Sequence, residues 1–347
     1  MRLEEISVPG WEKVVRARNE AVGLDSIIAV HDASLGPGLG GCRIRAYGAM
    51  EDALDDVKRL SRAMTYKNAL AGIPFGGGKA VIIADPKADK TRALFDAFAE
   101  ALNALNGLYY TAGDSGITDD DLAMIADVTS YVTGVTRDGA GGNPAPFTAR
   151  GVFRGIEAAA AAKFDNASLK GVRVAISGIG AVGMGLAALL HEAGAVLTVA
   201  DVNEAALSGA EQRFGARIVA PEACASADVD IFSPCALGGA VRAETIDAIK
   251  ASIIAGAANN QLWTSDMDAA LTERGILYAP DYVINAAGVI SVGLEVLGTW
   301  SEEEMTRRID AIGGTLTRIF QRADDEGRPT GAIADIMAHE VIDSARA

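Results

Sequence analysis

Apolar and polar positions follow two different patterns along the chain, and the change falls near residue 137. Beyond Lys170, short apolar runs alternate with helix-like segments. The runs expected to be strands are VRVAISG (172–178), AVLTVAD (195–201), DIFSPCA (230–236), SIIAGAA (252–258) and GILYAP (275–280), and helices are expected over 181–193, near 204–213 and near 243–249. Such alternation is typical of a parallel sheet with crossover helices. The fold class predicted for this half is α/β, a doubly wound Rossmann sheet.

The first part of the chain predicts a smaller α/β arrangement. Strands are expected at 26–31, at 80–85 and within GLYYTAGD (107–114), and helices over 50–70 and 88–105. The helix over 50–70 shows one apolar stripe at three- and four-residue steps. The stripe consists of Leu54, Val57, Leu60 and Met64 and is continued by Lys67. Two glycine-rich segments, 35–41 and AGIPFGGGK (71–79), are expected to be loops.

Composition narrows the class of protein. The chain has 347 residues, half of them hydrophobic, and a net charge of −15, which argues against nucleic-acid and anionic-membrane partners. Its three cysteines and three histidines are scattered without metal-ligand spacing, so no metal site is expected. No signal peptide and no apolar run of about 18 residues is visible. We therefore expect a cytoplasmic protein.

A glycine fingerprint joins the first strand and helix of the second half. Gly178, Gly180 and Gly183 form GxGxxG, and the next strand ends in Asp201, 18 residues after Gly183. Gly178 would make the tight turn, Gly180 would admit a pyrophosphate, and Gly183 would let helix and strand pack closely. The helix N-terminus would bind the phosphates, and Asp201 the adenine ribose. The pattern predicts a dinucleotide site.

NAD is the dinucleotide favoured by this pattern, because a carboxylate at Asp201 would repel the 2′-phosphate of NADP. A flavin usually has its fingerprint near the N-terminus, whereas this one starts at residue 178. A glycine-rich turn without a ligand is the plain structural alternative. Ligands of parallel sheets lie beyond the carboxyl ends of the strands, where Ala236, Leu237, Ala257, Ala258 and Asn259 are expected.

Two lysines stand in unusual positions in the first half. Lys67 continues an apolar stripe, and Lys79 follows three glycines and enters an apolar strand. Taken alone, Lys67 is explained as a lysine that snorkels at a helix end, and Lys79 as an ordinary lysine at a strand edge. Together they flank a surface without side chains, where one cation suits a substrate carboxylate and the other, if desolvated, could act as a base. Asp114 could be a second proton-transfer group or an Asx-turn residue.

A family resemblance extends over about residues 25 to 300. Its motifs, in order, are GPGLGGCRI, MTYKNALAGIPFGGGKAVI, YTAGDSG, FTARGVF, SGIGAVG, VADVN, PCALGG, GAANNQL and PDYVINAAGV. They resemble the leucine, phenylalanine and valine dehydrogenases, relatives of glutamate dehydrogenase. The resemblance implies reversible oxidative deamination of an L-amino acid to a 2-oxo acid and ammonia with NAD. It also implies a homo-oligomer, a dimer or an octamer.

The resemblance assigns a role to each matching position. Lys79 matches the catalytic lysine that activates water, Asp114 the aspartate that exchanges protons with the substrate nitrogen, and Lys67 the lysine that binds the substrate carboxylate. The other substrate positions are Leu39, Gly40, Gly76, Gly77, Ala112, Asn259, Val289 and Val292. The cofactor positions are Gly178, Ile179, Gly180, Ala181, Val182, Gly183, Asp201, Val202, Thr148, Ala236, Leu237, Ala257, Ala258 and Asn259.

Substrate choice depends on four positions that line the side-chain pocket in this family: Leu39, Ala112, Val289 and Val292. All are aliphatic here, so the resemblance favours leucine; phenylalanine dehydrogenase and a non-catalytic NAD sensor are the alternatives. Ala287 and Gly113 depart from the common pattern. The expected domains are 1–145 for substrate binding and oligomerisation, 146–320 for the dinucleotide, and 321–347 as C-terminal helices that could pack on the first domain.

Overall fold

The computed structural model describes residues 1–135, 144–236 and 238–346. The chain divides into two compact units. The first unit comprises Met1–Gly142, Val289–Glu302 and Ala338–Ala347, and the second comprises Asn143–Gly288 and Glu303–Met337. The sequence predicted three continuous parts. In the structure, the chain passes from one unit to the other after residues 288, 302 and 337, so neither unit is one continuous segment. No helix within the described ranges is long and apolar enough to span a membrane.

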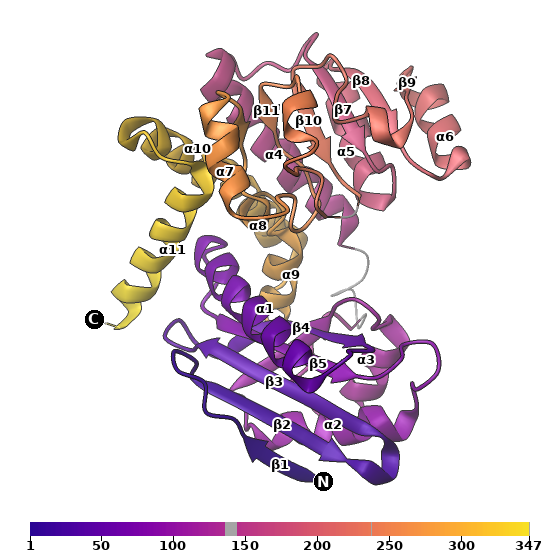
Figure 1. Cartoon of the computed structure of the whole chain (residues 1–347), viewed down its shortest axis with the longest axis vertical. Coiled ribbons are helices and arrows are strands. Elements are labelled where there is room, and N and C mark those ends of the chain that lie inside the picture. The colour runs from indigo at the N-terminus through magenta and orange to yellow at the C-terminus, as the bar shows by residue number, and fades with distance from the viewer. Residues whose placement is uncertain (136–143, 237, 347) are drawn as a thin grey trace. The chain divides into compact units, whose positions relative to one another are not determined.

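The first unit contains a six-stranded sheet in the order β1-β2-β3-β5-β4-β6 (Figure 1). Its strands are β1 (Arg2–Glu5), β2 (Lys13–Asn19), β3 (Leu24–Asp32), β4 (Gly38–Arg45), β5 (Gly76–Ile83) and β6 (Tyr109–Gly113). The pairs β1–β2, β2–β3 and β3–β5 are antiparallel, and β4 is parallel to both β5 and β6. Because β4 lies between β5 and β6, side chains from three distant segments meet there.

Helices cover both faces of this sheet. Helix α1 (Met50–Leu70) packs on β3 and β5 around Val57 and Val81. The opposite face packs on α2 (Arg92–Ala104) and α3 (Asp119–Ala126), with Phe95, Phe98 and Tyr109 in the core. Helix α9 (Ala287–Val296) returns to this unit from residue 289 onward, and the last part of α11 (Thr330–Arg346) packs on Ala69.

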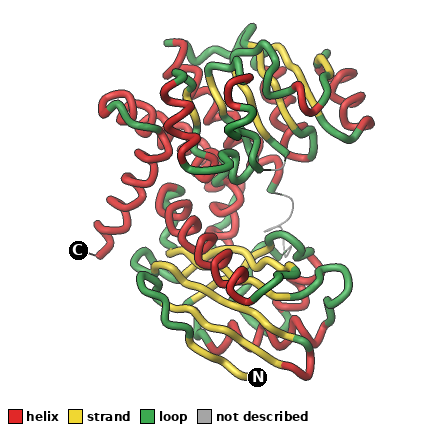
Figure 2. Tube along the Cα trace, viewed as in Figure 1, coloured by secondary structure: helices red, strands yellow, loops and turns green. Residues whose placement is uncertain are grey.

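The second unit confirms the predicted doubly wound parallel sheet. Its strand order is β12-β11-β10-β7-β8-β9, and every pair is parallel. The strands are β7 (Arg173–Ser177), β8 (Val196–Ala200), β9 (Arg217–Ile218), β10 (Ile231–Pro234), β11 (Ile253–Ile254) and β12 (Leu277–Tyr278). The helices are α4 (Ala145–Phe164), α5 (Ala181–Glu192), α6 (Glu204–Phe214), α7 (Asp266–Glu273), α8 (Asp281–Ile284) and α10 (Glu302–Glu326). Figure 2 shows these elements by type. The helix expected near 243–249 is only a 3₁₀ turn, Ile246–Ala248.

The glycine-rich segments of the first unit were expected to be loops, which is confirmed for 35–37 and 71–75 but wrong for the residues that follow. Gly38–Gly41 and Gly76–Gly78 lie inside β4 and β5. A Cβ on Gly77 would lie 2.1 Å from the Thr65 hydroxyl oxygen, and one on Gly78 would lie 2.4 Å from Cδ2 of Tyr109. Bare backbone is needed on both sides of β5 because α1 and Tyr109 approach it closely.

The buried face of α1 also differs from the predicted stripe. The residues that it buries are Ala53, Val57, Ser61, Thr65, Asn68 and Ala69, whereas Leu54, Leu60, Met64 and Lys67 are half-buried. Small side chains face the sheet because the helix lies directly on the glycines of β5. The larger apolar residues lie beside this contact. The stripe predicted from periodicity is therefore shifted by about one residue from the face that the helix buries.

Candidate functional site

Lys79 and Asp114 meet across the middle strand of three. Lys79 lies in β5, Asp114 directly follows β6, and β4 lies between these two strands. The Lys79 Nζ atom is 2.9 Å from Asp114 Oδ2, and the Lys79 side chain is 8% exposed. Gly41 of β4 makes this contact possible, since a Cβ there would lie 2.9 Å from the Cβ of Asp114. The structure thus joins two sequence candidates into one buried ion pair.

The carboxyl group of Asp114 is surrounded by positive charge. Burial alone would raise its pKa, but the nearby charges of Lys79 and Arg43 and hydrogen bonds from Lys79 and the Ser115 backbone outweigh burial, so the pKa lies below the ordinary value. Asp114 is therefore an anion at neutral pH.

The turn after β6 fixes the position of Asp114. Its own carbonyl oxygen accepts from the N–H of Ile117, and the Ser115 carbonyl accepts from the N–H of Ile44 on β4. Gly116 adopts a φ of +84°, and a Cβ there would lie 2.5 Å from both Cγ2 and the carbonyl oxygen of Ile44. This backbone attachment keeps the carboxylate beside β4.

Lys67 lies in the last turn of α1, where a cation also complements the helix dipole. Met64, one turn earlier, lies against Gly40, because a Cβ on Gly40 would be 3.0 Å from its Cγ. Asn68 donates to the carbonyl oxygens of Leu39 and Gly76 at 3.1 and 2.6 Å. These contacts attach the end of α1 to β4 and β5, so Gly40, Gly76 and Gly77 lie at a helix–sheet contact.

The four positions assigned to the side-chain pocket all belong to the first unit. Leu39 on β4 is fully buried, and Ala112 on β6 and Val289 on α9 are nearly so, whereas Val292 is half-buried. Helix α9 is held by Thr133, which donates to the Val292 carbonyl at 3.2 Å and to Glu295 at 2.9 Å. All four side chains are aliphatic.

The glycine-rich turn of the second unit has the geometry that its spacing predicts. Gly178 has a φ of +100°, and a Cβ there would lie 2.7 Å from the Ala236 nitrogen. A Cβ on Gly183 would lie 2.0 Å from the Gly178 carbonyl oxygen. Gly180, the exposed N-cap of α5, has no atom of the described chain within 4 Å of such a Cβ. Ala181 and Val182 begin α5 directly after Gly180, and the first N–H groups of a helix have no partner within the helix, so this end suits a phosphate.

Asp201, at the end of β8, closes this turn. Its Oδ2 accepts from the Ile179 N–H at 2.6 Å, and its Oδ1 accepts from the Asn203 N–H at 2.8 Å. Burial raises the pKa of Asp201, but hydrogen bonds from the Asn203, Ile179 and Val202 backbone lower it by more, so the net shift is downward. The next residue, Val202, is 91% exposed. A carboxylate is thus held next to the glycine-rich turn.

The remaining cofactor positions lie at the carboxyl ends of the strands or on α4. Ala258 donates its N–H to the Pro234 carbonyl, and the Asn259 side-chain oxygen accepts from Asn285 Nδ2 at 2.7 Å. Asn285 also donates to the Ala257 carbonyl at 3.1 Å. The Thr148 hydroxyl donates to the Pro144 carbonyl within α4. Leu237 lies outside the described residues.

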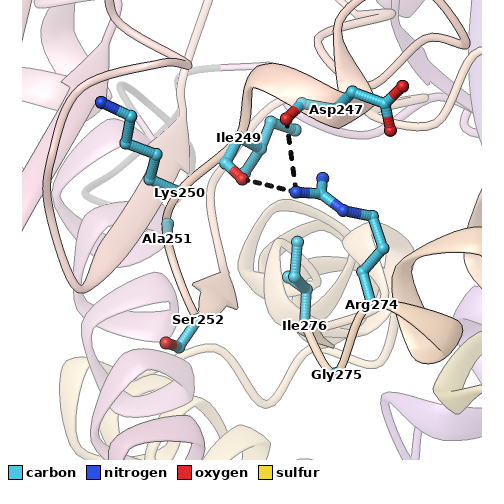
Figure 3. A pocket seen from close by; sticks show the side chains of 8 residues that line it. All are labelled: Asp247, Ile249, Lys250, Ala251, Ser252, Arg274, Gly275 and Ile276. Atoms are coloured by element: carbon cyan, nitrogen blue, oxygen red, sulfur yellow. Dashed lines mark hydrogen bonds between the residues drawn. The ribbon is translucent and has the colours of Figure 1, made fainter.

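A cavity of about 360 Å³ lies in the second unit, at the amino-terminal ends of β11 and β12 (Figure 3). Ser252 and Ile276 line it, and they precede β11 and β12, whereas the glycine-rich turn follows the carboxyl end of β7. Arg274 donates there to the backbone carbonyls of Asp247 and Ile249 at 3.4 and 3.0 Å. The cavity is therefore separate from the dinucleotide turn, and its arginine stabilises a loop.

Sequence reasoning missed Gly41, Arg43 and Asn285. In β4, Gly41 and Arg43 alternate with the buried Cys42 and Ile44, a pattern that an expected loop over 35–41 concealed. An arginine within a buried strand requires a carboxylate partner. That rule could have indicated that Arg43 contacts a carboxylate. Nothing in the sequence indicates Asn285, whose role is seen only in its contact with Asn259.

The parallel sheet with its glycine-rich turn, and a separate unit with a buried lysine–aspartate pair, define the class of two-unit dehydrogenases. A family model described as Glu/Leu/Phe/Val dehydrogenase, dimerisation domain, matches residues 11–131, and one described as Glutamate/Leucine/Phenylalanine/Valine dehydrogenase matches 143–210 and 200–346. The chain belongs to this Glu/Leu/Phe/Val dehydrogenase family, as the motifs predicted. It is therefore an amino-acid dehydrogenase, an oxidoreductase of a family that generally uses NAD or NADP.

Individual relatives carry different substrate names. A leucine dehydrogenase of Bacillus subtilis (strain 168) is 46% identical over 337 residues, covering 97% of this chain and 92% of the relative. An L-tryptophan dehydrogenase of Nostoc punctiforme (strain ATCC 29133 / PCC 73102) is 44% identical, covering 99% and 96%. The crystal structure of L-tryptophan dehydrogenase from Nostoc punctiforme superimposes with a TM-score of 0.88 at 42% identity, covering 97% of each chain. A phenylalanine dehydrogenase of Bacillus thermotolerans is 41% identical, covering 95% of this chain and 88% of the relative, so the chain is similar to leucine, tryptophan and phenylalanine dehydrogenases.

Proposed function

We propose that this protein catalyses the NAD-dependent, reversible oxidative deamination of a branched-chain L-amino acid, with leucine preferred, to the 2-oxo acid and ammonia. The observation that carries the proposal is the buried Lys79–Asp114 pair, 2.9 Å apart across Gly41. Intact acid–base groups also speak against a non-catalytic NAD sensor. The first unit, which matches a dimerisation-domain model, supports a homo-oligomer, which light scattering measures directly.

In the proposed mechanism, Lys67 binds the substrate carboxylate. Asp114 accepts a proton from the α-ammonium group, which frees the nitrogen lone pair needed for imine formation. NAD, when bound, supplies the hydride acceptor. Once Asp114 is neutral, Lys79 gives its own proton to solvent and then takes a proton from the water that attacks the imine carbon. Asp114 then returns its proton to the nitrogen of the hydrated imine, and the C–N bond breaks as the new O–H group gives its proton to solvent, so the products are the 2-oxo acid and ammonia.

The preference for leucine rests on the four aliphatic positions Leu39, Ala112, Val289 and Val292. They offer apolar surface to a branched side chain and no cation for a side-chain carboxylate. Ala112 carries a methyl group where a glycine would leave more space for a ring. Ala287 and Gly113, the two departures from the family pattern, make aromatic substrates the alternative to test.

An amino-acid panel tests the proposed reaction. We expect NADH formation at alkaline pH with L-leucine, L-valine and L-isoleucine, and the highest kcat/KM for L-leucine. One extra or missing methylene in an apolar pocket changes kcat/KM by roughly 10- to 200-fold, so the ranking should be clear. A higher kcat/KM for L-phenylalanine or L-tryptophan would replace leucine as the substrate. Absence of turnover with all five would refute the reaction itself.

The same assay with NADP tests cofactor choice. An ionised Asp201 beside the ribose should disfavour the 2′-phosphate by roughly 1–4 kcal/mol, which is about 5- to 1,000-fold in kcat/KM. Asp201→Asn keeps an oxygen for the Ile179 N–H but removes the charge, so the NAD preference should shrink while the turn persists. Equal kcat/KM for NAD and NADP in the unmodified enzyme would contradict this prediction.

A further inference from the structure

Arg43 is a charged side chain within the core of the first unit that the proposed mechanism does not use. It lies on β4, and its side chain is 17% exposed. Its Nε donates to Asp114 Oδ2 at 3.1 Å, and its Nη1 donates to Asp56 Oδ2 at 3.0 Å. Burying an arginine costs free energy unless its donors are paired, so this double attachment accounts for its presence.

The contact to Asp114 has a specific geometry. The same carboxylate oxygen, Oδ2, receives Lys79 Nζ from β5 and Arg43 Nε from β4. Two charge-assisted contacts on one oxygen restrict rotation of the carboxyl group. The other titratable groups that influence this site, Cys42 and Tyr109, are fully buried, and burial raises the pKa of both, so they stay neutral. Lys79 and Arg43 are therefore the two cations that contact Oδ2 and help to keep Asp114 an anion in one orientation.

Asp56 fixes the far side of the guanidinium. This α1 carboxylate also accepts from the Tyr47 hydroxyl at 2.8 Å and from Arg59 Nη2 at 2.7 Å. Burial raises the pKa of Asp56, but these hydrogen bonds and the charges of Arg43 and Arg59 lower it by more. Asp56 therefore remains an anion that holds Arg43 in one orientation and balances its charge.

We propose that Arg43 is a positioning residue for the deamination reaction, which holds the Asp114 carboxylate as an anion in one orientation and is itself anchored by Asp56. The proposal rests on the proposed function, in which Asp114 exchanges protons with the substrate nitrogen. The planar guanidinium of Arg43 can donate to the carboxylates of Asp114 and Asp56 at the same time. A lysine ammonium at the same position cannot do this equally well.

The test compares Arg43→Gln, Arg43→Lys, Asp114→Asn and the double variant Arg43→Gln/Asp114→Asn in the full-length enzyme. We expect Arg43→Gln to lower kcat roughly 100-fold, because a small misplacement of a reacting group has effects of that order. Its KM for NAD should stay unchanged. Arg43→Lys should recover part of the loss, and the double variant should be no slower than Asp114→Asn alone, since Arg43 acts through Asp114.

Arg16→Gln is the matched control. Arg16 lies in the same sheet, is 19% exposed and forms two contacts with Asp25, at 2.8 and 2.6 Å, away from Asp114. It should cause a comparable change in Tm with kcat intact. Comparable losses of kcat in Arg16→Gln and Arg43→Gln would show a merely structural effect and overturn the proposal, as would additive losses in the double variant.

A second readout does not depend on turnover. The ¹³C resonance of the Asp114 carboxyl carbon, assigned by its loss in Asp114→Asn, reports the protonation of this group. Its pKa should rise in Arg43→Gln, which removes one of two neighbouring cations, and stay constant in Arg16→Gln. An unchanged pKa in Arg43→Gln overturns the proposal. Absence of turnover in the unmodified enzyme would instead refute the proposed function, while this titration still decides whether Arg43 controls Asp114.

Discussion

Replacement of Lys79 by alanine is expected to lower kcat/KM for L-leucine by roughly 10³-fold. General acid–base catalysis by a positioned side chain contributes about 10²- to 10⁴-fold, and the proposed mechanism assigns Lys79 the activation of water. NADH binding should persist, because Lys79 belongs to the first unit and the Gly178–Gly183 turn to the second. Steady-state kinetics and NADH fluorescence titration measure the two effects separately.

Two further variants make this result specific. Lys79 is buried, so alanine leaves a cavity, whereas Lys79→Met fills the volume without an amine. Lys79→Met should lose as much activity as Lys79→Ala. Lys58→Ala removes a half-buried lysine that pairs with Asp55 on α1 and should leave kcat/KM unchanged. Retention of more than about a tenth of the activity in Lys79→Met would rule out the assigned role.

Gly183→Ala is expected to lower both the affinity for NADH and the stability of the protein. The added methyl group would lie 2.0 Å from the Gly178 carbonyl oxygen and 3.6 Å from the Cys235 Cβ. Because the closer neighbour is backbone, helix α5 must move away from the turn that is proposed to bind the phosphates. Overpacking of this kind costs about 3 kcal/mol, so both Tm and NADH affinity should fall.

Gly180→Ala and Gly209→Ala separate binding from stability. A methyl group at Gly180 meets no atom of the described chain within 4 Å, so Tm should stay constant while NADH affinity falls, because that space is proposed for the pyrophosphate. Gly209, within α6, has only Met184 Cε at 3.9 Å, and alanine there should keep both properties. An unchanged NADH affinity in Gly180→Ala would place the phosphates elsewhere.

Most of the second unit could be predicted from the sequence, because the patterns that indicate its elements lie within short segments of the chain. Apolar strands, crossover helices and the spacing of Gly178, Gly183 and Asp201 lie within short segments, and each follows from backbone geometry. The doubly wound sheet and the glycine turn were therefore recognised without tertiary information. The helix expected near 243–249 was wrong, since only the 3₁₀ turn Ile246–Ala248 forms there, and helices α4 and α7 were not predicted.

The first unit depended more on its tertiary structure. The sequence singled out Lys79 and Asp114 as unusual residues, but their pairing depends on the strand order β5-β4-β6, which no local pattern encodes. The same order places Gly41 between them and brings Arg43 against Asp114. Gly76–Gly78 resembled a loop because glycine disfavours regular structure, and became a strand because α1 and Tyr109 need the space. The sequence alone determined which side chains can carry the chemistry, and the packing of distant segments decided which of them meet.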